Sequence, residues 1–239
     1  MLIKGEFMNR MTCGLAVAAL GCAIAVGIPA EAQELQQKLG AAKQAAAQNQ
    51  QALRPFSWIE KTELSLKGEV KSTKVEACRY GADGKVQKTP IVEPPPPEKK
   101  GGLRGKVVAK KTGEMKEELE AAVALVHRYV PPAPDKMQAV MTAGTASIAQ
   151  AGPGVAALRF PGYEKAGDSL TLTFDTAVKT LRQLDVATYL AKPSDVVTFR
   201  VSMQSLPDGT GYPASIVLAM PASQIEVRIM NINYQKLAP

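Results

Sequence analysis

The sequence predicts an α+β fold in which a curved antiparallel β-sheet, a half-barrel of about nine strands, is covered by about three helices. Three observations support this prediction. Apolar and polar residues alternate with period two over 56–92 and again over 155–229. Helix-forming composition fills separate stretches between residues 34 and 149. Because the long run of strands follows the helices, βαβ crossovers and a parallel sheet are disfavoured.

The N-terminal segment 1–32 has the pattern of a secretory signal peptide that is removed from the mature protein. Lys4 and Arg10 form a positive start, Cys13 to Ile28 is an almost uncharged apolar run, and Ala30-Glu31-Ala32 matches a small-x-small cleavage site. We therefore expect a periplasmic protein.

The mature chain is expected to form one domain over 33–239. Two alternatives for the N-terminal segment stay open. It is short for a membrane anchor, which needs about 20 apolar residues. Lipidation at Cys22 would associate the protein with the outer membrane, although Ala19 stands where a lipobox prefers Leu.

Cysteine usage excludes an intramolecular disulfide in the mature chain. Of three cysteines, Cys13 and Cys22 leave with the signal peptide, and only Cys78 remains. Cys78 lies in an alternating stretch, which favours a small buried apolar side chain over a reactive thiol.

The first predicted elements are a helix over 34–53 and three strands. Phe56 to Lys67 alternates with period two, and a second strand follows through Tyr80. Ala82-Asp83-Gly84-Lys85 predicts a hairpin turn into a third strand at Val86 to Val92.

A long exposed loop is predicted over 93–112, because Pro94 to Pro97 stop regular structure and Gly and Lys residues follow. Its basic residues are candidates for contact with an anionic membrane surface or an envelope protein; a solvated loop is the simpler interpretation. These surface-contact candidates are Lys99, Lys100, Arg104, Lys106, Lys110 and Lys111. Nucleic acid is not expected as a partner, because the segment offers no aromatic residue for base stacking.

The remaining elements are two helices and an antiparallel meander. Acids near Glu114 begin a helix over 113–130, Pro131-Pro132 end it, and Asp135 caps a short helix that fades into the Gly and Ala residues of 143–154. Six strands follow, beginning at Val155.

At this point the chain resembles the exported lipoprotein-carrier superfamily, which includes LolA-like, LolB-like and RseB-like proteins. The resemblance rests on the element order over about 35–236 and on the stretches Phe56-Ser57-Trp58-Ile59-Glu60-Lys61-Thr62-Glu63 and Leu181-Arg182-Gln183-Leu184-Asp185-Val186. It implies a half-barrel closed by helices around an apolar cavity. The basic and Pro-rich insertion at 93–112 departs from these carriers, and no position matches a cargo-binding arginine.

The sequence contains little that indicates a catalytic site or a metal site. His127 is the single histidine, so a His-rich zinc site is excluded, and no Gly-x-Ser-x-Gly motif accompanies it. No cofactor motif is present, since 101–106 lacks the Gly-Lys-Ser/Thr ending of a phosphate loop. An enzyme would need a carboxylate cluster among Glu60, Glu63, Asp168, Asp175 and Asp185, whose spacing does not predict one.

The apolar side chains that could line a cavity therefore suggest the function. We expect a noncatalytic exported carrier or sensor that binds a lipid, an acylated ligand or another apolar molecule between sheet and helices. The candidate cavity residues are Phe56, Trp58, Leu64, Met137, Met141, Phe174, Phe199, Met203 and Met220. The alternative is an envelope protein-protein interaction module whose core is filled by the same side chains.

Overall fold

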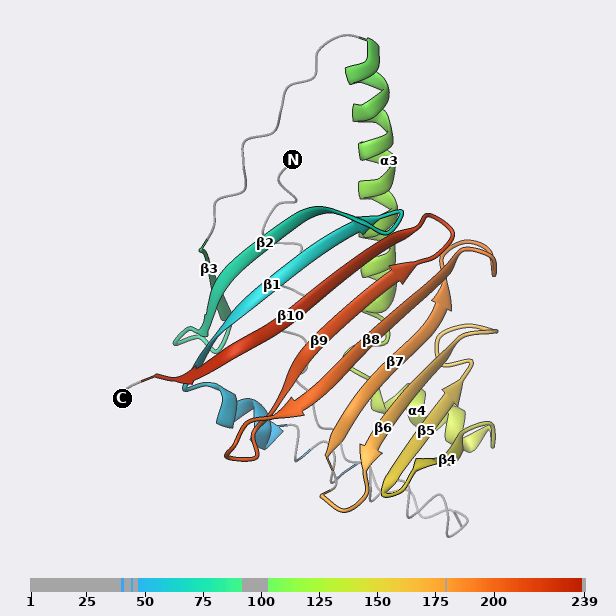
Figure 1. Ribbon diagram of the computed structural model, residues 1–239. Helices are drawn as coiled ribbons and strands as arrows, with labels where there is room; N and C mark the ends of the chain where they lie inside the picture. Colours follow the sequence, from blue (N-terminus) through green and yellow to red (C-terminus); the bar gives the residue numbers. More distant parts are fainter. Residues whose placement is uncertain (1–39, 41–43, 45–46, 92–102, 179, 238–239) are drawn as a thin grey trace.

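The computed structural model describes residues 40, 44, 47–91, 103–178 and 180–237, with side chains between 103 and 111 left out (Figure 1). Residues 47–53 form a short helix ahead of the first strand. The two longer helices are α3 (Leu103–Val126) and α4 (Pro134–Thr142). The strands are β1 (Phe56–Leu66), β2 (Glu69–Tyr80), β3 (Val86–Pro90), β4 (Ser147–Gly152), β5 (Val155–Pro161), β6 (Ser169–Asp175), β7 (Leu181–Tyr189), β8 (Val196–Ser205), β9 (Gly211–Met220) and β10 (Ile225–Lys236).

All ten strands belong to one open antiparallel sheet with the order β3-β2-β1-β10-β9-β8-β7-β6-β5-β4. Every neighbouring pair is consecutive in the chain except β1 and β10, which join the start of the domain to its end. In that pairing Thr62 lies opposite Ile229 and Glu60 lies opposite Asn231. The α+β half-barrel predicted from the alternation is confirmed, with ten strands in place of nine.

Helices α3 and α4 connect the two edges of this sheet, because they follow β3 and precede β4. Both lie on the same face of the sheet, and the N-terminal part of α3 extends past the end of the strands (Figure 1). A helix of 24 residues is about 36 Å long, which is longer than most strands of the sheet. The helix-bearing face of the sheet is called the inner face below.

The main core lies between these helices and the strands β5 to β10. Helix α3 contributes Leu119, Ala122 and Val126, which meet strand residues such as Leu170 and Leu218. All five are buried, with exposed fractions of 0 to 3%. Complete burial of apolar side chains stabilises the fold most strongly where packing leaves no space.

The predicted loop over 93–112 is wrong in its second half, because α3 begins at Leu103. Arg104, Lys106, Lys110 and Lys111 are therefore helical in backbone. The region between Leu103 and Thr112 contains Val, Ala, Lys and Arg, which favour or tolerate a helix, so its single internal glycine does not break it.

The tenth strand was not predicted. The sequence predicts the fading end of a helix over 143–154, whereas α4 ends at Thr142 and Ser147–Gly152 forms β4. Its residues Ser, Ala, Gln and Gly have low strand propensity, and their side chains are mostly exposed. Pairing with β5 at the sheet edge, not local preference, accounts for this strand.

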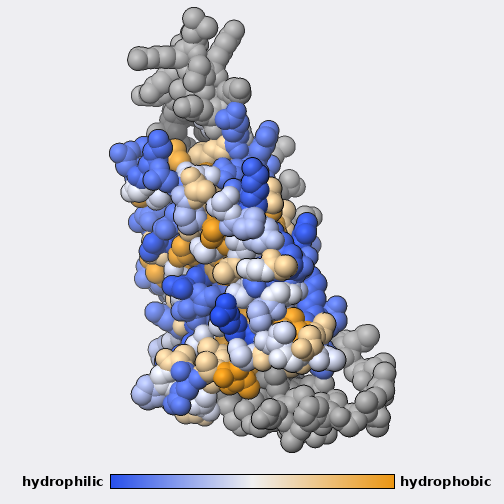
Figure 2. Space-filling view, turned by 90° about the vertical axis from the view of Figure 1, so that its right-hand side faces the viewer, coloured by the Kyte–Doolittle hydropathy of each residue, from blue (hydrophilic) through white to orange (hydrophobic). Residues whose placement is uncertain are grey.

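Several predictions lie outside the described residues: the signal peptide over 1–32, the loop over 93–102, and the basic residues Lys99 and Lys100. Within the part of the chain that is described, no helix has the length and apolar composition needed to cross a membrane. The side of the molecule that carries β4 and α4 shows apolar and polar residues interspersed, without one continuous apolar patch (Figure 2).

Candidate functional site

The inner face of β1 changes in character along the strand. Leu64 and Leu66 pack against the main core beneath α3. Thr62 and Glu60 follow on the same face and are buried, although neither is apolar. Trp58 comes next and belongs to a second, separate cluster, which it forms with Cys78 and Val86. A buried polar zone therefore separates two apolar zones on one face of the sheet.

Two carboxylates meet in this polar zone. Glu60 on β1 lies directly opposite Glu76 on β2, and their exposed fractions are 0% and 4%. Lys88 Nζ lies 2.6 Å from Glu60 Oε1, and Lys74 Nζ lies 2.7 Å from Glu76 Oε1. We call Glu60, Glu76, Lys74 and Lys88 the charged quartet. Like charges directly opposite each other destabilise a sheet unless they are compensated, and the two lysines supply that compensation.

Three polar atoms of this zone lack a hydrogen-bond partner within the described part of the chain. Glu60 Oε2, Glu76 Oε2 and Thr62 Oγ1 are buried and have no hydrogen-bond partner among the described residues. A buried polar atom without a partner costs about 1–3 kcal/mol of stability. Native proteins keep such atoms rarely, and they concentrate where a function requires them.

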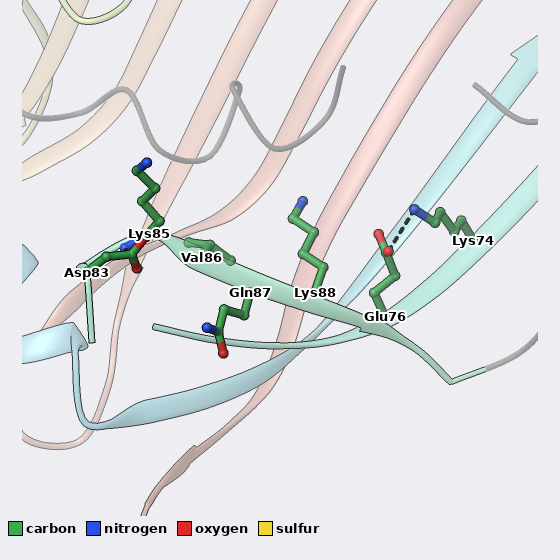
Figure 3. A pocket seen from close by; sticks show the side chains of 7 residues that line it. All are labelled: Lys74, Glu76, Asp83, Lys85, Val86, Gln87 and Lys88. Atoms are coloured by element: carbon green, nitrogen blue, oxygen red, sulfur yellow. Dashed lines mark hydrogen bonds and ion pairs between the residues drawn. The ribbon is translucent and has the colours of Figure 1, made fainter. Parts of the chain in front are cut away.

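A polar pocket of about 390 Å³ adjoins the charged quartet. Lys74, Glu76 and Lys88 line it together with residues of the β2–β3 hairpin, namely Asp83, Lys85, Val86 and Gln87. In Figure 3 the side chains of Lys85 and Lys88 project from the same side of β3, while Gln87 projects from the other. The volume falls within the range of small-molecule pockets, about 300–1,000 Å³.

An aromatic row lies beside the quartet, because Trp58 is the next inner residue of β1 after Glu60. Trp58 stacks on Tyr234 of β10 with ring centroids 5.4 Å apart, and Tyr80 of β2 lies at the same distance from Trp58 at a tilt of 50°. Tyr212 of β9 extends the row, 4.3 Å from Tyr234. We call Tyr80, Trp58, Tyr234 and Tyr212 the aromatic row. Such pairs contribute about 0.5–1.5 kcal/mol beyond burial and form a rigid apolar wall.

Hydrogen bonds fix the orientation of Trp58 within this row. The indole nitrogen of Trp58 donates to Asn231 Oδ1 at 3.1 Å, and Asn231 Nδ2 donates to the carbonyl of Pro213 at 2.7 Å. Asn231 is buried and lies opposite Glu60 in the register of β1 and β10. The same residue therefore borders both the quartet and the row.

Cys78 lies opposite Trp58 and is buried in the second cluster. Burial, followed by the negative charge of Glu60, raises the pKa of its thiol to about 12. The thiol is therefore protonated at neutral pH and is a poor nucleophile. This agrees with the interpretation of Cys78 as a small core residue.

The five carboxylates considered for catalysis do not come together. Glu63 pairs with Lys61, Asp175 with Arg182, Asp185 with Arg200, and Asp168 accepts a hydrogen bond from Tyr129, so each has its own structural partner. Glu60 faces Glu76, which the sequence did not single out. His127 follows α3 directly and is exposed. Among the described residues no group of three or more His, Cys, Asp or Glu side chains is arranged to hold a metal ion.

The candidate cavity residues are distributed between the two apolar zones. Met137, Phe199 and Met220 are buried in the main core. Leu64, Met141, Phe174 and Met203 are partly buried against it. Trp58 lies in the second cluster, and Phe56 is buried at the start of β1.

A second pocket touches the main core near its edge. It measures about 360 Å³ and is bordered by Glu118 of α3 and Met220 of β9. The hydroxyl of Ser223, another of its lining residues, donates a hydrogen bond to Glu118. Met220 is the one cavity candidate among its lining residues, so this pocket does not unite the predicted set.

Comparisons with known proteins do not assign the chain to a family. No family model matches it, and no curated protein matches it. A solved structure of a DUF1329 family protein from Desulfovibrio piger aligns with 10% sequence identity and a TM-score of 0.38, covering 83% of this chain and 93% of that chain.

Proposed function

We propose that the protein is a noncatalytic carrier or sensor, exported to the periplasm, that binds an amphiphilic ligand on the inner face of β1, β2, β3 and β10. The observation that supports this most is the buried charged quartet, with its unpartnered oxygens, directly beside the aromatic row. The row offers an apolar wall for a hydrocarbon chain, and the quartet offers a polar end.

The position of the proposed site follows from packing. The space beneath α3 and α4 is occupied by the main core, whose residues are at most 8% exposed. The part of β1 beyond Thr62 leaves that core and carries the polar zone and Trp58. A ligand on this part of the face would contact both kinds of surface without displacing the main core.

Native mass spectrometry of the mature protein, purified gently from the bacterial envelope, tests the proposal. We expect a stoichiometric extra mass that denaturation releases and that lipid analysis identifies as an amphiphile. A bare protein mass, together with no gain in thermal stability from any amphiphile tested, would contradict it.

The filled main core favours a second candidate, an interaction module for the envelope surface. The basic residues of α3 would then bind an anionic membrane, since each cation near such a surface contributes about 1 kcal/mol. Sedimentation with vesicles of phosphatidylglycerol tests this. Binding that disappears when Arg104, Lys106, Lys110 and Lys111 are replaced by Gln would favour this candidate, and no binding at low salt would exclude it.

A further inference from the structure

The three unpartnered atoms of the site share a chemical property. Glu60 Oε2 and Glu76 Oε2 accept hydrogen bonds, and Thr62 Oγ1 both accepts and donates. All three belong to side chains that are more than nine-tenths buried. A ligand group that removes the free-energy cost of these unpaired atoms must therefore bring hydrogen-bond donors into the polar zone.

The charge of the site discriminates among donors. Two glutamates and two lysines pair one to one, so the charged quartet is formally neutral. An added ammonium group would leave one buried positive charge uncompensated, which is costly. An anionic group would be repelled by the free carboxylate oxygens of Glu60 and Glu76. A neutral hydroxyl donates without adding charge.

The spacing of the acceptors suits more than one hydroxyl. Glu60 and Glu76 are directly opposite across two strands, where Cβ atoms lie about 5 Å apart. Thr62 is the next residue on the same face of β1, about 6.6 Å farther along. Trp58 is the next residue in the other direction and begins the aromatic row.

We infer that the ligand of this site carries a neutral, hydroxyl-rich polar end, as an alkyl glycoside does, held by Glu60, Glu76 and Thr62. The inference rests on the proposed function, and it adds the chemical class of the head group. The apolar chain of such a ligand lies along the aromatic row.

Calorimetric titration with four octyl compounds, each below its micelle concentration, tests the head group. Octyl glucoside offers neutral hydroxyls, octylammonium a cation, octanoate an anion, and octyl acetate the same chain without a donor. We expect octyl glucoside to bind most tightly. Loss of one hydrogen bond corresponds to about a fivefold loss of affinity.

Two variants at the site and one outside it make the test specific. Thr62→Val removes an unpartnered hydroxyl, so it should leave the thermal midpoint unchanged or raised while it weakens binding of octyl glucoside about fivefold. Glu76→Gln keeps an oxygen for Lys74 and removes the free acceptor. Glu63→Gln changes a carboxylate on the opposite face of β1, where Glu63 pairs with Lys61, so binding should not change.

The outcomes separate the two proposals. Tightest binding of octyl glucoside, weakened by Thr62→Val and Glu76→Gln alone, supports the inference. Equal binding of all four compounds overturns it and retains the proposed function, since water then satisfies the acceptors. Tightest binding of octylammonium or octanoate also overturns it. Failure of every compound to bind overturns the proposed function as well.

Discussion

The phenol of Tyr129 donates a hydrogen bond to the carboxylate of Asp168, and this bond joins the segment after α3 to the residue before β6. Both side chains are buried, with exposed fractions of 0% and 3%. Thr188 of β7 shares the phenol oxygen at 2.8 Å, and backbone N–H groups of Glu164 and Lys165 donate to the same carboxylate. This network fixes the end of the long helix on the sheet.

Replacing Tyr129 with Phe should lower the free energy of unfolding by about 2 kcal/mol, because a buried hydrogen bond to a charged group is lost. Urea unfolding measures this as a lower midpoint with an unchanged slope. Tyr189→Phe is the matched control, since its phenol donates to the carbonyl of Ala166 at the surface. Equal effects of the two substitutions would contradict the structural role of the Tyr129–Asp168 bond.

Cys78 should resist thiol reagents in the folded protein. Its thiol is 1% exposed and its pKa is raised to about 12, so at pH 8 it is both covered and protonated. In a protein that begins at Gln33 and so keeps Cys78 as its single cysteine, absorbance with a disulfide reagent should show no reaction in the native state and one thiol per chain in guanidinium. Fast labelling without denaturant would show that the second cluster opens readily.

Stability should fall at alkaline pH. Burial raises the pKa of Cys78 from 9.0 and that of Tyr163 from 10.0 to about 12 in the folded protein. The unfolded chain therefore releases these protons first, so their contribution is complete below about pH 9 and is lost as pH rises toward 12. Urea midpoints at about pH 8 and about pH 10.5 test this, and the midpoint should be lower at the higher pH.

Tyr163→Phe is the variant for the alkaline test. It removes the acceptor of the Ala133 N–H, which lies 2.6 Å from the phenol oxygen, so the variant is less stable at pH 8. It should lose less stability than the parent between the two pH values. An identical decline in both proteins would place the alkaline transition in other groups.

The exposed edge strand β4 should promote self-association. Ser147–Gly152 carries no charge, and Ile148 on it is 57% exposed. An uncharged sheet edge pairs readily with another chain. Ile148→Lys should reduce light scattering at high protein concentration without moving the urea midpoint. Unchanged scattering would mean that association uses another surface.

The parts of the fold that follow local rules were predictable. Alternation from Phe56 to Leu66 defines β1 and its inner face, and the Asp83-Gly84 turn defines the β2–β3 hairpin. The start of α3 was missed because Pro and Gly residues precede it, and β4 was missed because only pairing with β5 forms it.

The candidate site was less predictable because it depends on registers between strands. Glu60 meets Glu76 only through the pairing of β1 with β2, and Trp58 meets Tyr234 only because the first strand pairs with the last. One local signal was present: Glu60 occupies an inner position between Trp58 and Thr62 in the alternation. A charged residue at such a position indicates either a compensating partner or a function.

Fluorescence quenching of Trp58 tests the central claim, a ligand on the inner face beside the quartet, most directly. Trp58 is the single tryptophan of the chain, so its emission reports on this site alone. Titration with an alkyl glycoside brominated on its chain should quench the emission to saturation, and the same compound without bromine should not. Calorimetrically detected binding of the brominated compound with no quenching would place the ligand elsewhere and contradict the claim.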